Sequence, residues 1–518
     1  MAKLYIPPSF RTTLSFSQYG DIVSGAVKYY TFLGRSTGWP DELNPPDVSS
    51  SFQFETETRK NILVMKQIEN KNVSLGVRRY DWAGGIVYDY YDDINLNPDT
   101  AKYFVINSEN NIYKCIWNGG GAPSNVEPRG TPLSIVELSD GYKWKYLFTV
   151  SDSDLEKFLL PDFIPIKDVT TGSSIVESIL VESGGSGYLD GTAVKVIITG
   201  DGVGATATAT VSGGVVRSVK ITSGGSGYSY AVATIDQMSS PMGSGVDLRV
   251  IVDKSTNTSV QSLVQALAVD GAINHLIVES SGSDYLNTVK IEIDGDGEGA
   301  LAEPIIDAGK IVGINVISPG FGYRRTVVNV VKNSPSDPGS GGQIRAIISP
   351  LGGHGSDLKS ELFAIAVMFY ATFEFEGVAS DFFVNNEFRQ LGLVRAPTLF
   401  GSSTPATDVT YNACYVINFD RSITIDLDDV LQNEESGVAL RLVEIRDSNK
   451  GFFQSIGNFP PQVGDELKSA SDTQSINIIN VVPPEIDAFS GSIIFIENRT
   501  SITRSKDQVE TLKTVLKY

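Results

Sequence analysis

The chain has 518 residues, with 41 lysines and arginines against 61 aspartates and glutamates, which gives a formal charge of −20. This acidity argues against a nucleic-acid partner, because nucleic-acid-binding domains carry a basic surface. With two histidines and two cysteines, the chain has too few of these residues for a disulfide framework or a cysteine-rich zinc site, and histidine-dependent catalysis is disfavoured. The 50 glycines are the unusual feature of the composition.

The N-terminus shows no signal-peptide pattern, and Pro7 and Pro8 are expected to interrupt any helix there. The longest apolar run, 362–375, has 14 residues, whereas a membrane-spanning helix needs about 20. We therefore expect a soluble protein without membrane insertion. Cys115 and Cys414 are expected to be reduced and buried, as in a cytoplasmic protein.

The first third of the chain reads mainly as strands with one helix. The helix is predicted over 55–69, where Ile62, Leu63 and Ile68 form a partial apolar stripe. Alternating or continuous apolar runs predict strands over 103–106, 112–117 and 144–150.

The middle third contains an internal repeat. The sequence Ser-Gly-Gly-Ser-Gly-Tyr occurs at 183–188 and 223–228, and variants of it occur at 280–285 and 318–323. A second glycine-rich turn lies between the paired copies, at 200–205 and again at 295–300. A unit of about 95 residues has therefore been duplicated.

Period-2 apolar runs flank these turns and predict antiparallel hairpins. The turns need glycine because a positive φ is unfavourable for residues with a Cβ atom, and the closing tyrosine is expected to anchor a small core. Between the two units, 258–267 has helical spacing. Further along, Asp357 is expected to cap a short helix, and strands are predicted over 476–482 and 493–497.

One acidic turn has part of the pattern of a calcium loop. Asp294, Asp296 and Glu298 occupy its first, third and fifth positions, but the twelfth position holds Ile305 instead of a bidentate glutamate. An acidic hairpin tip is the favoured interpretation. We therefore predict no metal site, with these three residues as weak candidates.

Enzyme motifs are incomplete. Residues 34–38 match G-x-S-x-G, but no helical pattern follows to form a nucleophile elbow. Carboxylate pairs such as Asp92 and Asp93 fit glycoside hydrolysis, although adjacent acids are expected by chance in so acidic a chain. We predict a protein that is not an enzyme and that has no cofactor.

The segment 78–82 (Arg-Arg-Tyr-Asp-Trp) has two interpretations. Arginine and tryptophan are enriched at interface hot spots. The same residues can instead hold a loop within the fold through an ion pair or a cation–π contact. The sequence does not separate these alternatives.

Several short sequence motifs outside the repeats, called boxes below, resemble segments of the T-even-type phage baseplate wedge subunit, the gene product 8 family. They occur in the same order as in that family. A further box at 352–357 resembles a segment of its marine-phage relatives. The ordered boxes are 32–39, 78–82, 140–148, 388–393 and 490–499. The matching positions offered as fold or interface candidates are Arg35, Trp39, Arg79, Asp81, Trp82 and Arg499.

The strand patterns predict a mainly-β fold with few helices. The resemblance does not cover 175–350, and it implies a β-sandwich core for the flanking segments. We therefore interpret the duplicated all-β region as an insert that makes this core discontinuous. The core would comprise 1–174 and 351–518. The insert would comprise repeat unit 1 (175–254), a linker with helical spacing (255–273) and repeat unit 2 (274–350).

The same resemblance implies an architectural role in the virion. The protein would be a homodimer in each wedge of the tail baseplate, assembled in the host cytoplasm. It would bind other wedge proteins and those that carry the short tail fibres, and take part in the rearrangement that triggers sheath contraction. Two alternatives remain: an adhesin that binds host carbohydrate through the Gly-Tyr repeats, and an acidic glycan-degrading enzyme.

Overall fold

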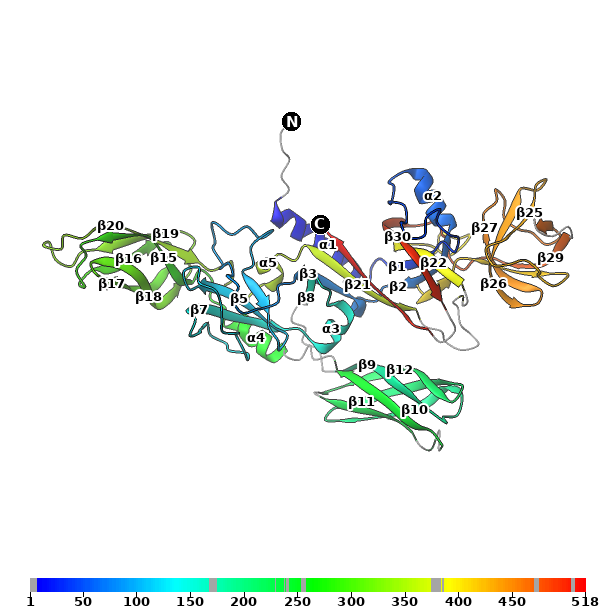
Figure 1. The fold of residues 1–518 in the computed structure, drawn as a ribbon, viewed down its shortest axis with the longest axis horizontal. Helices are drawn as coiled ribbons and strands as arrows, with labels where there is room; N and C mark the ends of the chain where they lie inside the picture. Colours follow the sequence, from blue (N-terminus) through cyan, green and yellow to red (C-terminus); the bar gives the residue numbers. More distant parts are fainter. Residues whose placement is uncertain are drawn as a thin grey trace.

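The computed structural model describes residues 7–166, 175–228, 230–236, 238, 242–252, 258–373, 383, 386–469, 475–504 and 508–518. These residues form many antiparallel sheets and a few short helices, which confirms the predicted mainly-β class. The molecule is elongated, with a β-barrel at one end and repeat unit 2 at the other (Figure 1). None of the helices within the described ranges combines the length and apolar content that a bilayer crossing requires.

Two central sheets join segments from both ends of the chain. The first contains, in spatial order, β23 (Thr410–Asn412), β2 (Ile62–Gln67), β1 (Tyr29–Gly34), β22 (Asn386–Arg395) and β30 (Ser492–Arg504). The second contains β31 (Glu510–Lys517), β21 (Ala366–Phe373), β3 (Val73–Arg78) and β8 (Phe163–Ile166). In the first sheet Phe32 pairs with Gly392, where an added Cβ would collide with the Phe32 ring and the carbonyl oxygen of Phe495. The sequences on either side of the repeats therefore fold together.

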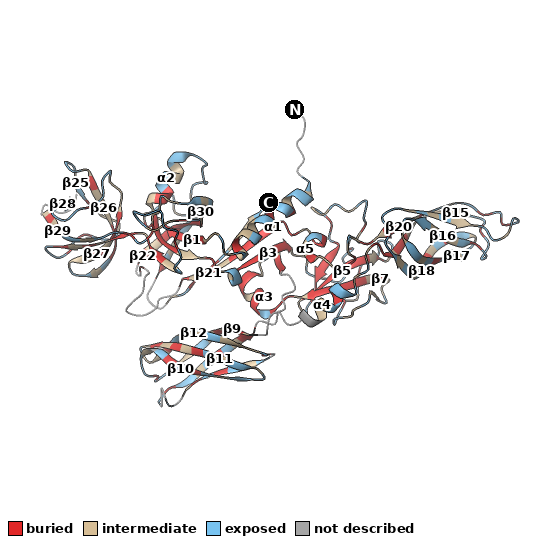
Figure 2. Cartoon of the chain, turned by 180° about the vertical axis from the view of Figure 1, so that it is seen from behind, coloured by how far each residue is buried: buried red, intermediate tan, exposed pale blue. Residues whose placement is uncertain are grey.

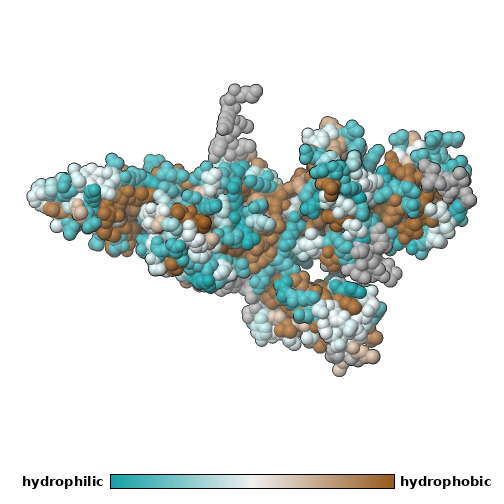
Figure 3. Space-filling view, in the orientation of Figure 1, coloured by the Kyte–Doolittle hydropathy of each residue, from teal (hydrophilic) through white to brown (hydrophobic). Residues whose placement is uncertain are grey.

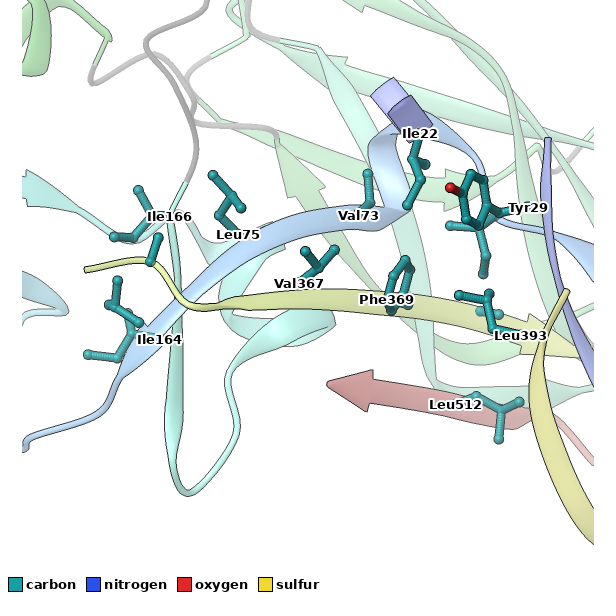
Figure 4. Packing of buried hydrophobic residues seen from close by; sticks show 14 of the residues in the cluster. Ile22, Tyr29, Val73, Leu75, Ile164, Ile166, Val367, Phe369, Leu393 and Leu512 are labelled. Atoms are coloured by element: carbon teal, nitrogen blue, oxygen red, sulfur yellow. The ribbon is translucent and has the colours of Figure 1, made fainter. Parts of the chain in front are cut away.

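The two sheets share one apolar core. Tyr29 and Leu393 of the first sheet lie near Val73, Phe369 and Leu512 of the second (Figure 4). All five side chains are at least nine-tenths buried. β1 is buried along its whole length and β3 at every position but the last, because each strand is covered on both faces.

A third sheet lies beside these layers. It contains β4 (Phe104–Ile106), β5 (Asn111–Asn118), β7 (Tyr142–Thr149) and β6 (Val136–Glu137). Trp144 is fully buried in its core, where it stacks on Tyr142 and meets Tyr88 edge-on.

Six strands close into a barrel with its own apolar core. They are, in order around the barrel, β24 (Tyr415–Phe419), β27 (Lys450–Ser455), β26 (Val438–Asp447), β25 (Val430–Asn433), β28 (Glu466–Ser469) and β29 (Ser475–Val482). The core contains Ile417, Phe419, Leu440, Leu442 and Phe453. The sequence-based division did not separate this barrel from the remainder of 351–518.

The two repeat units each contain six strands and share three antiparallel pairings: the first strand with the sixth, the second with the fifth and the third with the fourth. In unit 1 the second strand also pairs with the third. Unit 1 contains β9 (Val176–Ser186), β10 (Gly191–Gly200), β11 (Val203–Ser212), β12 (Val215–Ser226), β13 (Ala231–Ile235) and β14 (Ser244–Val252). Unit 2 contains β15 (Ile273–Ser283), β16 (Lys290–Gly295), β17 (Glu298–Asp307), β18 (Lys310–Phe321), β19 (Thr326–Val331) and β20 (Ser340–Ile348). Each unit has a separate apolar core, and burial alternates along its strands (Figure 2).

The closing tyrosines of the repeat are core residues, as predicted. Tyr188, Tyr228, Tyr285 and Tyr323 are all at most 6% exposed. Each ring packs against a glycine of a Gly-x-Gly turn, where a Cβ atom would overlap the ring. Because the rings are buried, they are occupied within the fold and do not present a surface for stacking on a sugar.

Replacing Gly227 with alanine is expected to lower the free energy of unfolding of unit 1 by about 1–2 kcal/mol. Gly227 has a φ of +78°, which is strained for alanine. Gly191→Ala is the matched control, because its backbone is not left-handed and the added Cβ would meet Val194 Cγ2 at 3.7 Å, an ordinary contact. Denaturant unfolding should show a loss for the first variant and a change within about 0.5 kcal/mol for the second. Equal losses would contradict the role assigned to the positive φ.

Helices cover small parts of the chain. They are α1 (Pro8–Val23), α2 (Phe52–Lys60), α3 (Asp152–Phe158), α4 (Thr258–Ala266), α5 (Leu358–Glu361) and a 3₁₀ turn (Asn70–Asn72). The helical spacing at 258–267 and the Asp357 cap are confirmed, since the Asp357 side chain accepts the N–H of Ser360.

Two helix predictions were wrong. The helix predicted over 55–69 ends at Lys60, because Ile62 and Leu63 belong to a buried strand of the first sheet. Pro7 and Pro8 do not prevent a helix either. Pro8 is the first residue of α1, a position where the missing N–H removes no helical hydrogen bond.

Candidate functional site

Three of the predicted candidates, Arg35, Trp39 and Arg499, lie together at the end of β1. The Arg35 guanidinium carbon lies 3.8 Å from the centre of the Trp39 ring, and Arg35 has a φ of 57°. Trp39 Nε1 donates to the carbonyl oxygen of Arg499 at 2.7 Å, across 460 residues of sequence. Burial lowers the pKa of Arg35. These contacts give the three residues a role in holding the fold.

Arg389 on β22 is the central side chain of this cluster, although the sequence analysis did not select it. It is 6% exposed, and its Nε lies 2.8 Å from Glu42 Oε1. Its Nη1 donates to the carbonyl oxygen of Ser36. Glu42 Oε1 also accepts the Trp39 N–H at 2.9 Å. Its position inside box 388–393 was the signal that could have revealed it.

The other three candidates, Arg79, Asp81 and Trp82, form a second cluster. Arg79 makes a forked pair with Asp81, with N···O distances of 2.9 to 3.1 Å, and donates to the carbonyl oxygen of Leu160. Trp82 Nε1 donates to Ser124 Oγ at 3.2 Å. Of the two interpretations left open by the sequence, these contacts match the one in which the residues hold a loop within the fold.

The family-like boxes converge in space as two groups. Boxes 32–39, 388–393 and 490–499 lie on or beside the adjacent strands β1, β22 and β30. Boxes 78–82 and 140–148 meet at Ser124, which accepts from Trp82 and donates to Asp140 at 3.2 Å.

The acidic turn is a hairpin cap in the structure. Asp296 accepts the backbone N–H groups of Arg324 and Arg325 at 2.8 and 2.9 Å, and these bonds lower its pKa. Asp294 accepts from the Asn329 side chain, and Glu298 is exposed. No set of three potential metal ligands gathers anywhere in the described part of the chain. The weak metal candidates therefore do not form a ligand cluster.

The third sheet contains a buried ion pair that the sequence analysis missed. Lys114 Nζ lies 2.8 Å from Glu361 Oε2, and the two side chains are 0% and 2% exposed. The ammonium also lies 3.9 Å from the centre of the Tyr91 ring. His354 is packed edge-on against Tyr91, and its Nδ1 is 3.9 Å from Glu361. Burial lowers the pKa of Lys114, and the Glu361 charge opposes that shift.

Repeat unit 2 docks on the third sheet through side chains. Arg345 of β20 lies 2.5 Å from Asp92 and 3.5 Å from Asp93. His275 of β15 stacks on Trp117 of β5, with ring centres 4.1 Å apart. Asp92 and Asp93 thus contribute to a contact between parts of the chain.

The two repeat units present different outward faces at equivalent positions. Thr206 and Thr222 of unit 1 are hydrogen-bonded across β11 and β12 at 2.7 Å. The residues 95 positions later are Leu301 and Ile317, which are 61% and 55% exposed. Ile305, which corresponds to Thr210, is 52% exposed. Hydrophobic residues accordingly reach the surface of unit 2 (Figure 3).

No family model matches the chain, and a search of curated proteins finds no match in sequence.

Proposed function

We propose that the chain is an architectural subunit of the baseplate wedge of a contractile phage tail. The observation that carries this proposal is the convergence of boxes 32–39, 388–393 and 490–499 on three adjacent strands. Hydrogen bonds join these boxes into one unit, although the bonded residues lie more than 350 residues apart in sequence. Arg389 donates to the carbonyl oxygen of Ser36, and Trp39 donates to that of Arg499. Such a unit suits rigid-body movement between two assembly states, which is the movement that sheath contraction requires.

In this role the protein binds other proteins of the particle and does not transform a substrate. Its partners are a second copy of the chain, other wedge proteins and those that carry the short tail fibres. Its place is the tail baseplate of the virion, after assembly in the host cytoplasm. The elongated shape, with separate modules at both ends, supports contacts with several neighbours (Figure 1).

The outward face of β17 and β18 supports one such contact. Unit 1 shows that this six-strand fold forms with threonines at these positions, so its own core does not require Leu301, Ile305 and Ile317. Glu303 lies between Leu301 and Ile305 on the same face of β17. The chain carries a charge of −20, which disfavours a second copy here. The partner that fits is a wedge protein with an apolar surface and a basic side chain opposite Glu303.

Exchanging Leu301, Ile305 and Ile317 for the threonines of unit 1 is expected to weaken incorporation into particles by about 100-fold or more. The melting temperature should stay near that of the wild type, because the exchanged side chains are exposed. Thr208→Glu is the matched control, since it places the counterpart of Glu303 on unit 1. Quantitative mass spectrometry of purified particles measures incorporation. Normal incorporation of the triple variant would exclude this face as a contact.

Electron cryo-microscopy of intact particles tests the function itself. The expected result is density for the barrel, the central sheets and both repeat units within the baseplate, around its hub. The isolated chain should also form a dimer of twice 55.8 kDa by light scattering. Absence of the chain from purified particles, or its location in the head, would overturn the proposal.

A further inference from the structure

A pocket of about 700 Å³ lies where the third sheet, the end of α4 and repeat unit 2 meet. Its walls are mostly apolar and include Leu133, Ile135, Leu267 and Val269. Two basic side chains, Lys145 and His354, also line it. Volume and composition are typical of small-molecule sites, which are largely apolar with a few polar groups that orient the ligand.

The charges beneath this pocket do not balance. Lys145 of β7 pairs directly across the sheet with Lys114 of β5, so two ammonium groups share one region. Glu361 is the carboxylate at this place, and it is engaged by Lys114 at 2.8 Å and by the N–H of Gly355 at 2.6 Å. With both lysines charged and His354 neutral, the group has one positive charge in excess.

Lys145 is the lysine of this group that makes no ion pair with a carboxylate in the described part of the chain. It is 6% exposed and donates to the carbonyl oxygen of Leu133. Within the described residues no acidic side chain lies at ion-pair distance from it. Burial lowers the pKa of Lys145, and an anion bound beside the ammonium would stabilise its charged form.

His354 also lines the pocket. Its Nδ1 is fully enclosed and lies 3.9 Å from Glu361 Oε2, so this atom is not available to a ligand in the pocket. Burial lowers the pKa of His354 well below 6.5, so the ring adds no positive charge to the site at neutral pH.

We propose that this pocket binds a small amphipathic carboxylate. The carboxylate pairs with Lys145 at the base of the pocket, and the apolar body of the ligand lies against Leu133, Ile135, Leu267 and Val269. A monoanion fits because it neutralises the single excess charge, whereas a phosphate dianion would leave the site negative. The apolar walls select against a small hydrophilic acid such as formate.

Calorimetric titration of the full chain with octanoate tests this site. Saturable binding is expected, and octanamide, which has the same length without the charge, should bind at least about tenfold more weakly. Lys145→Met should weaken octanoate binding by about the same factor while raising the melting temperature of the free protein, because a buried charge is removed.

Lys143→Met is the matched control. Lys143 lies on the same strand, two residues away, and pairs with Glu137 at 3.4 Å at the surface. Its substitution should leave octanoate affinity within about twofold of the wild type. Absence of saturable heat up to about 10 mM octanoate would overturn the proposal. Equal affinity of the wild type and Lys145→Met would overturn it as well. A melting temperature of Lys145→Met at or above that of the wild type would show that the variant is folded, so that weaker binding by it reports on the site.

Discussion

Replacing Glu361 with glutamine is expected to lower the free energy of unfolding by about 3–5 kcal/mol, the usual effect of breaking a buried ion pair. The substitution keeps the size of the side chain and an oxygen that can accept the Gly355 N–H. It removes the negative charge 2.8 Å from Lys114, which is fully buried. Urea unfolding of the full chain, followed by tryptophan fluorescence, measures the change.

Two further variants serve as controls for the effect of Glu361→Gln. The exposed pair of Lys143 and Glu137 lies on the same sheet, so Glu137→Gln should change the free energy of unfolding by less than about 0.5 kcal/mol. Combining Glu361→Leu with Lys114→Met should recover most of the loss, because the charge of Lys114 is then removed together with that of its partner. A loss below about 1 kcal/mol in Glu361→Gln would contradict a charged Lys114 that depends on this carboxylate.

Lowering the pH from 7 to 5 is expected to remove about 2 kcal/mol of stability through His275 alone. The side chain is 7% exposed and stacks on Trp117. Burial, with a smaller effect of Lys143, lowers the pKa of His275 from 6.5 to about 3. Above pH 6.5 the imidazole is neutral in both the folded and the unfolded chain. Below that pH the unfolded chain binds a proton that the folded chain does not, so stability falls progressively towards pH 3.

His275→Phe provides the control, because phenylalanine can keep the ring contact with Trp117 and does not titrate. Urea unfolding at several pH values between 7 and 5 should show a shallower loss in this variant. His354 adds its own contribution in the same direction, because burial and the charges of Lys114 and Lys145 lower its pKa well below 6.5. The same pH dependence in His275→Phe and in the wild type would contradict the assignment.

Local features of the fold were predictable because neighbouring residues decide them. The duplicated glycine turns require positive φ at Gly185, Gly187, Gly225 and Gly227, and the closing tyrosines follow within one residue. At the position equivalent to Gly187, unit 2 has Asp284 with a φ of 61°, which aspartate tolerates better than most residues. The cap at Asp357 was visible for the same reason, since its hydrogen bond spans three residues.

Features that depend on distant contacts were not predictable. Residues 55–69 have helical spacing, but from Ile62 onward the chain forms strand β2, because β2 pairs in a sheet that also contains strands from the other end of the chain. The role of Arg389 depends on Glu42, 347 residues earlier. The excess charge at Lys145 appears only when β5 and β7 align Lys114 opposite it and Glu361 approaches from α5.

The sequence by itself determined the mainly-β class, the duplication of the middle region and its buried tyrosines, because these follow from short-range periodicity and from turns that only glycine fills easily. The tertiary structure decided the pairing of β1 with β22, the separate barrel at 415–482, the buried pair of Lys114 and Glu361 and the pocket beside it. These depend on which distant segments approach one another, and that choice is set by the burial of whole sheet faces, which no local pattern encodes.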